Sequence, residues 1–160
     1  MQFLQFAAAV VISYLGLLAG FLLAYVTQEE MQTAAKYLPL LQRIIILVIA
    51  VVVTDFFGIH LALKLLIYLA TIAVIIFSLN IRPFYVVFGV LLFAVAVSQN
   101  TVLILSSMIF LFGLVSGSQH FAKAVKKRSQ MLTAVKNLLL VNLNYPVIAL
   151  IMFLLSLLPA

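Results

Sequence analysis

The sequence alternates between long apolar stretches and short polar segments along its whole length. The apolar stretches are close to the roughly 20 residues that cross a bilayer as a helix. Their apolar residues are continuous rather than alternating with polar ones, which favours helices over the strands of a membrane barrel. The pattern predicts one all-α integral membrane domain over residues 1–160. This domain is a compact bundle of six transmembrane helices at about 3–26, 40–57, 61–78, 84–97, 102–117 and 133–158.

Turn-forming residues separate these stretches. Gly58 predicts a tight reversal, Pro83 suits the first turn of a new helix, and residues 98–101 form an uncharged hairpin. Thr27 begins a pattern typical of a helix N-terminus, which predicts a short amphipathic helix before Pro39. A bundle of five membrane helices, with the third and fourth stretches divided differently, is the alternative.

The composition excludes a soluble globular domain. Hydrophobic residues make up 68% of the chain and charged residues 8%, whereas a soluble surface needs roughly a quarter of its residues charged. The chain has no cysteine, which excludes disulfides, thiolate metal sites and cysteine nucleophiles. No basic segment precedes the first apolar stretch, so we expect this helix to be retained rather than removed as a signal peptide.

The densest positive charge lies between the fifth and sixth stretches, in Lys123, Lys126, Lys127 and Arg128. By the positive-inside rule this segment faces the cytoplasm. Loops one, three and five are then cytoplasmic, both termini lie outside, and every Lys and Arg except Lys64 falls on the inner side. The net charge of +6 indicates contact with anionic lipid headgroups rather than nucleic acid. Apolar residues interleaved with these lysines predict an amphipathic segment over 118–132 on the inner leaflet.

Two pairs of glycines are spaced about one helical turn apart. Gly16 and Gly20 lie in the first predicted helix, and Gly113 and Gly117 lie in the fifth. Glycines four residues apart leave a flat face that another helix backbone can approach closely. We predict close packing of both helices, either against each other or against other helices of the bundle.

The last apolar stretch carries polar residues near the predicted bilayer centre, namely Asn142, Asn144 and Tyr145. Pro146 has no N–H, so we expect the carbonyl of Asn142 to lose its helical partner. Interrupted helices of this kind hold substrates or ions in transporters. The other polar side chains predicted at similar depth are Ser13, Tyr14, Tyr68 and Thr71. These groups form either hydrogen bonds between helices, which is the favoured interpretation, or a mid-membrane site.

A second polar group lies at the outer end of the hairpin between the second and third stretches. His60 and Lys64 are four residues apart and share a helix face, and Asp55 lies across the turn. Ionisable groups in a membrane helix raise the hypothesis of a proton relay. Because water reaches this end of the helices, an ion pair between Asp55 and Lys64 is the favoured interpretation.

No catalytic motif is present in the sequence. Three acidic residues and two histidines are too few for metal-assisted phosphate chemistry, and the histidines lie on opposite sides of the predicted membrane. The sequence has no Walker loop, dinucleotide fingerprint or Gly-x-Ser-x-Gly elbow. We therefore expect no enzymatic activity, no cofactor and no metal.

The run from Gly16 through Glu29-Glu30 to Lys36-Tyr37 and Leu40-Leu41-Gln42-Arg43 resembles small archaeal-type polytopic membrane proteins of unassigned function. The resemblance covers roughly the first quarter of the chain and implies no activity, ligand or catalytic residue.

The pattern as a whole predicts a protein of the cell membrane whose partners are lipids and either further copies of itself or a larger membrane complex. A non-catalytic membrane subunit or scaffold is the leading functional hypothesis, because apolar helices and small-residue interfaces suffice for it. A small transporter or channel lined by the interrupted last helix is the alternative. A lipid-modifying enzyme is the third.

Overall fold

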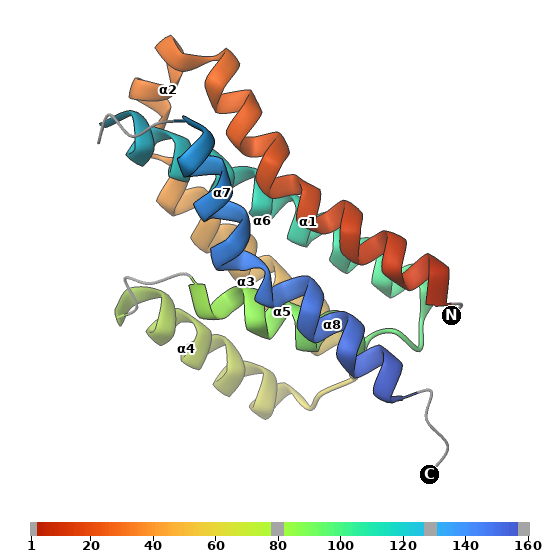
Figure 1. The fold of residues 1–160 in the computed structure, drawn as a ribbon. Helices are drawn as coiled ribbons and strands as arrows, with labels where there is room; N and C mark the ends of the chain where they lie inside the picture. The colour runs from red at the N-terminus through yellow and green to blue at the C-terminus, as the bar shows by residue number, and fades with distance from the viewer. Residues whose placement is uncertain (1–2, 78–81, 127–130, 157–160) are drawn as a thin grey trace.

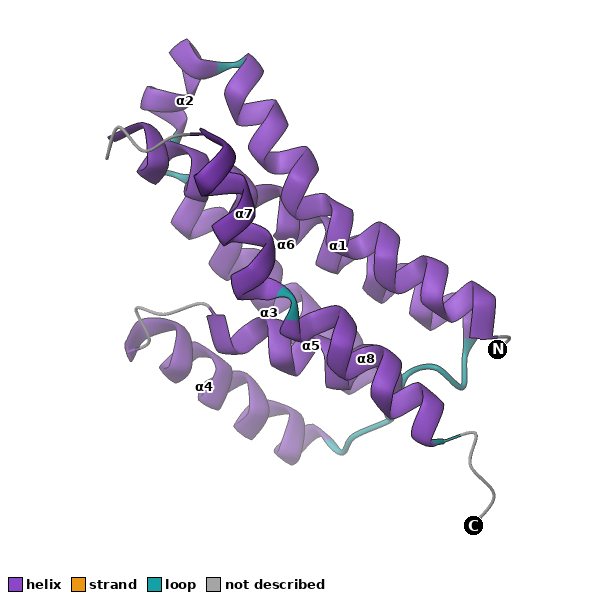
Figure 2. Cartoon of the chain, viewed as in Figure 1, coloured by secondary structure: helices purple, strands orange, loops and turns teal. Residues whose placement is uncertain are grey.

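The computed structural model describes residues 3–77, 82–126 and 131–156, and every regular element in these ranges is an α-helix (Figure 1, Figure 2). The helices are α1 (Phe3–Val26), α2 (Gln28–Ala34), α3 (Leu38–Phe56), α4 (Leu61–Phe77), α5 (Arg82–Ala94), α6 (Gln99–Lys126), α7 (Met131–Asn142) and α8 (Asn144–Leu155). This is the all-α bundle that the sequence predicts.

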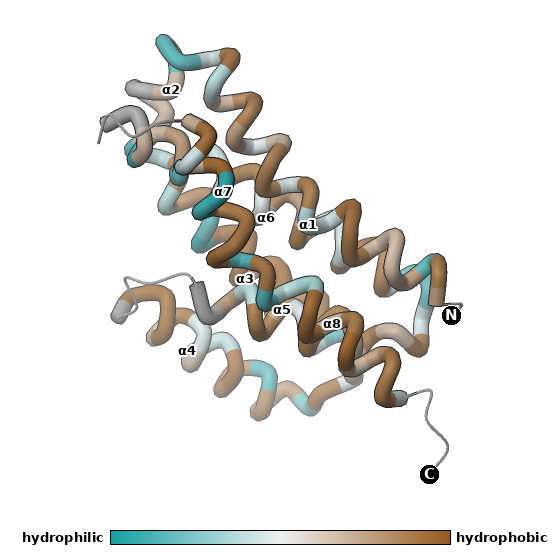
Figure 3. The backbone as a smooth tube through the Cα atoms, viewed as in Figure 1, coloured by the Kyte–Doolittle hydropathy of each residue, from teal (hydrophilic) through white to brown (hydrophobic). Residues whose placement is uncertain are grey.

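Four helical segments are long and apolar enough to cross a membrane: Phe3–Val26, Leu38–Phe56, Gln99–Ala124 and Met131–Leu155. The last of these consists of α7 and α8 placed end to end (Figure 1). The apolar parts of α4 and α5 are shorter, at Leu61–Ile76 and Phe84–Ala94. Apolar residues dominate the helices, and polar residues gather at their ends and at a few interior positions (Figure 3).

The most extensive helix–helix contact is that between α1 and α6, which run side by side (Figure 1). Gly16 faces Phe110 and Gly20 faces Leu114, so residue numbers rise in the same direction along both helices and the pair is parallel. Helix α3 packs on α6, α8 packs on α5 and α1, and α4 lies at the edge against α3.

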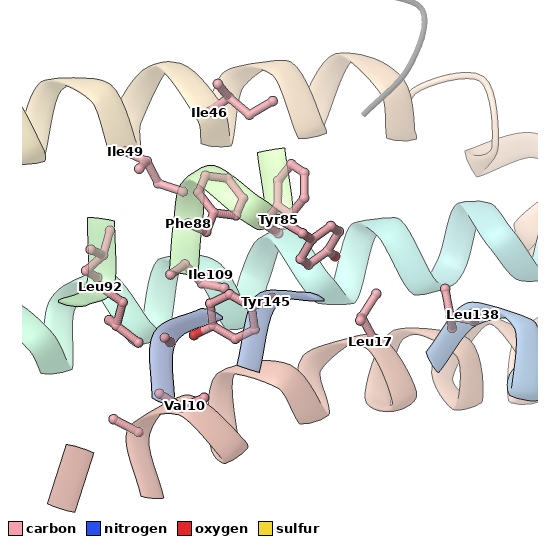
Figure 4. Packing of buried hydrophobic residues seen from close by; sticks show 14 of the residues in the cluster. Val10, Leu17, Ile46, Ile49, Tyr85, Phe88, Leu92, Ile109, Leu138 and Tyr145 are labelled. Atoms are coloured by element: carbon pink, nitrogen blue, oxygen red, sulfur yellow. The ribbon is translucent and has the colours of Figure 1, made fainter. Parts of the chain in front are cut away.

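Aromatic rings fill the space between α5, α6 and α8. Phe88 and Phe112 meet edge to face with ring centroids 4.9 Å apart, and Tyr85 meets Phe112 at 5.3 Å. Tyr145 lies in the same cluster and is fully buried (Figure 4). This packing holds the short helix α5 in the bundle, because large rings bury more apolar area per residue than aliphatic side chains.

Helix α6 is longer than the sequence predicts. We predicted a helix over 102–117 and a separate amphipathic segment over 118–132, whereas α6 continues to Lys126. Ser118 and Phe121 in this extension are buried against α1, where Ser118 Oγ donates to the Gly20 carbonyl at 2.9 Å. Phe121 also meets Phe21 edge to face at 5.3 Å. Packing on α1 therefore extends the helix past the end of its apolar stretch.

The helix that follows α1 begins without the predicted side-chain cap. The hydroxyl of Thr27 donates back to the Leu23 carbonyl at 3.0 Å, and the structure gives it no bond to an N–H of α2. Thr27 thus satisfies the last turn of α1 rather than the first turn of α2. Pro39 lies in the first turn of α3, where its missing N–H removes no helical hydrogen bond.

Candidate functional site: polar contacts around the broken last helix

The last long helix is broken at Leu143, between α7 and α8. The N–H of Leu143 bonds to the carbonyl of Leu140 at 3.4 Å, one residue short of its helical partner Leu139. The Leu139 carbonyl accepts instead from the hydroxyl of Tyr14 on α1, at 2.6 Å. Because Leu143 no longer bonds to Leu139, a side chain from another helix completes the backbone hydrogen bonding at Leu139. The N–H that Pro146 lacks would have bonded to the carbonyl of Asn142, four residues earlier.

A second contact joins α1 to α8, on the other side of the break. Ser13 Oγ and Tyr145 Oη lie 2.5 Å apart, and both residues are buried. Ser13 gives its single proton to the Val10 carbonyl at 2.9 Å, so the tyrosine is the donor in the contact between the two hydroxyls. The rings of Tyr14 and Tyr145 are also stacked, with their centroids 6.5 Å apart. A hydrogen bond between two hydroxyl groups therefore holds α8 against α1, in addition to side-chain packing.

The structure brings together some of the predicted mid-membrane residues. Ser13, Tyr14 and Tyr145 meet beside the break. Asn142 is buried at the end of α7 and donates from Nδ2 to the Leu138 carbonyl of its own helix at 2.7 Å. Asn144, two residues later, is exposed. The spacing of the two asparagines explains the difference, because residues two apart lie on opposite helix faces.

The two remaining predicted residues contact other elements. Tyr68 on α4 shares a hydrogen bond of 2.8 Å with Thr54, a buried residue of α3. Thr71 donates to the Ile67 carbonyl within α4 at 2.8 Å. These hydroxyls therefore serve the α3–α4 pair and helix α4 itself rather than the break in the last helix.

A polar group that sequence reasoning missed links α3 to α6. Gln42 is 1% exposed, and its Nε2 donates to Ser116 Oγ at 2.6 Å while its Oε1 accepts from Gln119 Nε2 at 2.8 Å. Gln42 lies inside an apolar stretch next to Arg43, and only the arginine was interpreted from the sequence. The sequence does contain a signal for this site, which is an uncharged amide among leucines and isoleucines. A buried amide requires hydrogen-bond partners, so its presence in an apolar stretch predicts a polar contact with another helix.

Gly16 and Gly20 of α1 contact the backbone of α6, and Gly113 and Gly117 of α6 contact the backbone of α1. A Cβ built at Gly16, Gly20 or Gly117 would lie under 3.0 Å from a backbone oxygen of the facing helix, and one at Gly113 would lie 2.9 Å from the Leu17 nitrogen. The α1 and α6 backbones are therefore in direct contact, in a parallel arrangement that only residues without a Cβ allow.

The hairpin between α3 and α4 contains an ion pair between Lys64 and Asp55. It spans the turn between α3 and α4, where Gly58 has a φ of 58°, a left-handed conformation that glycine adopts without strain. His60 is exposed at the start of α4. Both partners of the pair lie near the surface of the hairpin, so the pair stabilises the turn only weakly.

The basic segment is only partly described. Lys123 is exposed near the end of α6, and Lys126 is the last residue of that helix. Lys127 and Arg128 lie outside the described residues. Across the described ranges, no group of three or more His, Cys, Asp or Glu residues is arranged to hold a metal ion.

Comparison with known proteins adds no family to this picture. The chain matches no protein-family model, no curated protein and no solved structure.

Proposed function

We propose that this chain is a polytopic integral membrane protein with a structural role, a non-catalytic subunit or scaffold of the cell membrane. The observation that carries the proposal is the internal use of its mid-membrane polar groups. Ser13 pairs with Tyr145, Tyr14 completes the hydrogen bonding of the broken helix, and Asn142 bonds to its own helix. Groups that are already paired inside the bundle stabilise it and are not free to hold a solute.

The parallel α1–α6 pair supports the same role. Its backbones touch at Gly16, Gly20, Gly113 and Gly117, so the two helices cannot separate or slide without losing close contacts along several turns. A rigid helix pair of this kind suits a protein that presents the exposed faces of its helices to partners. Lipids, further copies of the chain or a larger membrane complex are the partners that such helices contact.

The parallel pair also supports six membrane crossings over five. Helices α1 and α3 follow one another and therefore cross the membrane in opposite directions. If α6 crosses in the same direction as α1, the chain between α3 and α6 must cross an even number of times, because a single crossing there would make α1 and α6 antiparallel. Six crossings follow if α4 and α5 both span the membrane. With the basic segment inside, both termini lie outside, loops one, three and five are cytoplasmic, and their lysines and arginines contact anionic headgroups.

Single cysteines provide a direct test of this topology, since the chain has none of its own. In intact cells we expect a membrane-impermeant maleimide to label His60→Cys and to leave Glu30→Cys and Asn80→Cys unlabelled until the cells are opened. Labelling of Asn80→Cys in intact cells would show that α4 and α5 return to the outer side without crossing. Neutralising Lys123, Lys126, Lys127 and Arg128 together should scramble the labelling pattern, whereas Lys64→Ala should preserve it.

Transport is the second candidate function, and the break at Leu143 is the observation that favours it. Discontinuous helices expose backbone carbonyls at mid-depth, which is how several transporters bind ions and substrates. In this protein the carbonyl released by the break, that of Leu139, is occupied by Tyr14. Transport would require this contact to open, which makes it the less favoured function.

Flux through reconstituted liposomes separates the two functions. We expect vesicles containing the protein to be no more permeable to protons, potassium ions or glycerol than empty vesicles. The buried Asn142 and the exposed Asn144 provide a matched pair of substitutions to leucine. Flux in the wild type that Asn142→Leu abolishes and Asn144→Leu preserves, with both variants folded, would replace the structural role by transport.

A further inference from the structure

The hydroxyl of Tyr85 has an unusual environment. Tyr85 lies on α5, is 4% exposed, and packs its ring against Phe112 and Tyr145. Its Oη forms no hydrogen bond with any part of the chain that the structure describes. A buried hydroxyl without a partner is costly, because it has lost its hydrogen bonds to water and gained none in return.

Ser116 lies four residues beyond Phe112 on α6, so it shares the helix face that meets Tyr85. Ser116 Oγ accepts a hydrogen bond from Gln42 Nε2 at 2.6 Å, and within residues 3–77, 82–126 and 131–156 the structure gives its own proton no acceptor. A serine hydroxyl has one proton and two lone pairs, and a tyrosine hydroxyl has one proton and acceptor capacity of its own. Both groups thus have hydrogen-bonding capacity left over, on facing helices and beside the amides of Gln42 and Gln119.

We propose that a water molecule is bound where α3, α5 and α6 meet, hydrogen-bonded to Tyr85 Oη and Ser116 Oγ. Water suits this position because it is small, uncharged, and both a donor and an acceptor. Buried waters typically make two to four hydrogen bonds to protein groups that have no other partner. The bound water joins α5 to the polar group of α3 and α6, and it gives this short helix a polar attachment in addition to its aromatic packing.

Radiolytic labelling tests the site, because hydroxyl radicals formed from a bound water oxidise the side chains that touch it. Tyr145 is the internal control, since it is the same residue type, is fully buried, and has its hydroxyl paired with Ser13. In the folded protein in nanodiscs we expect Tyr85 to be oxidised several-fold faster than Tyr145. Equal rates for the two tyrosines would overturn the proposal.

A substitution at the second partner assigns the water to this position. Ser116→Ala should lower the oxidation rate of Tyr85 to that of Tyr145, and Ser116→Thr, which keeps a hydroxyl, should preserve the difference. An unchanged rate at Tyr85 in Ser116→Ala, with Tyr145 still protected, contradicts the proposal.

Thermal stability gives a readout that is independent of labelling. Tyr85→Phe removes the Tyr85 hydroxyl, which is either hydrogen-bonded to the proposed water or without any hydrogen-bond partner. Loss of a hydroxyl that is bonded to water lowers the thermal midpoint, by about 2–4 °C for a chain of this size. Loss of a buried hydroxyl that has no partner raises the midpoint, because the cost of burying it is removed. A midpoint above that of the wild type would therefore overturn the proposal.

Discussion

The hydroxyl of Tyr14 donates a hydrogen bond to the backbone carbonyl of Leu139, 2.6 Å away on a helix 125 residues later in the chain. The carbonyl is available because Leu143 bonds to Leu140 instead. The contact couples the centre of α1 to the break in the last long helix, and it connects a local change in backbone hydrogen bonding at Leu143 to the packing of the bundle.

Removing this hydroxyl should destabilise the fold without altering its packing. We expect Tyr14→Phe to lower the free energy of unfolding by about 0.6–1.7 kcal/mol, the range of hydrogen bonds between membrane helices. The measurement is reversible unfolding in bicelles. Tyr25→Phe is the matched control, because Tyr25 lies on the same helix and is 49% exposed. Equal losses in the two variants would show that the Leu139 contact contributes nothing specific.

The contact between Ser13 and Tyr145 predicts a coupling energy that a double-mutant cycle can measure. Ser13→Ala and Tyr145→Phe should each destabilise the protein, and the double variant should lose less than the sum of the two. A coupling of about 0.6–1.7 kcal/mol is expected. Additive losses would show that the two hydroxyls do not interact, even though they lie 2.5 Å apart.

The glycine contacts predict a steric effect of one methyl group. In Gly117→Ala the new Cβ would lie under 3.0 Å from the Leu17 carbonyl oxygen, a backbone atom that cannot move alone. The helices must separate, at a cost of about 1–3 kcal/mol, the range found for overpacked cores. Leu22→Ala, on an exposed face of α1, is the control for a change in side-chain size that leaves the interface intact. Stability of Gly117→Ala at the wild-type level would contradict the close approach.

The ion pair of the α3–α4 hairpin predicts a small loss of stability on substitution, which salt reduces. Asp55→Asn removes the partner of Lys64 at a position that water reaches, so the loss in thermal midpoint should be smaller than for Ser13→Ala. At high ionic strength the difference between wild type and Asp55→Asn should shrink further. His60→Ala, an exposed neighbour, is the control. A larger loss than that of Ser13→Ala would indicate a role for Asp55 beyond the hairpin.

Parts of the candidate site could be predicted from sequence, and parts could not. Ser13 and Tyr145 were identified because polar residues in long apolar stretches are conspicuous. Their pairing was not predictable, since periodicity along each helix says nothing about which helix faces which. The exposure of Asn144 follows from helix geometry once the start of α8 is known. Gln42 was overlooked because an uncharged amide next to an arginine looks like part of a helix end.

The sequence by itself determined the helical class, the helix ends near Gly58 and Pro39, and the positions of the glycine pairs. These features depend on local chemistry: apolar runs need internally satisfied backbone, and special residues mark turns. Only the tertiary structure decided that α1 and α6 are parallel neighbours, that α6 extends to Lys126, and that Tyr14 completes the hydrogen bonding of the last helix. In an apolar chain nearly every helix face is hydrophobic, so hydrophobicity does not select partners. Close backbone approach at glycines and scarce polar contacts make that selection.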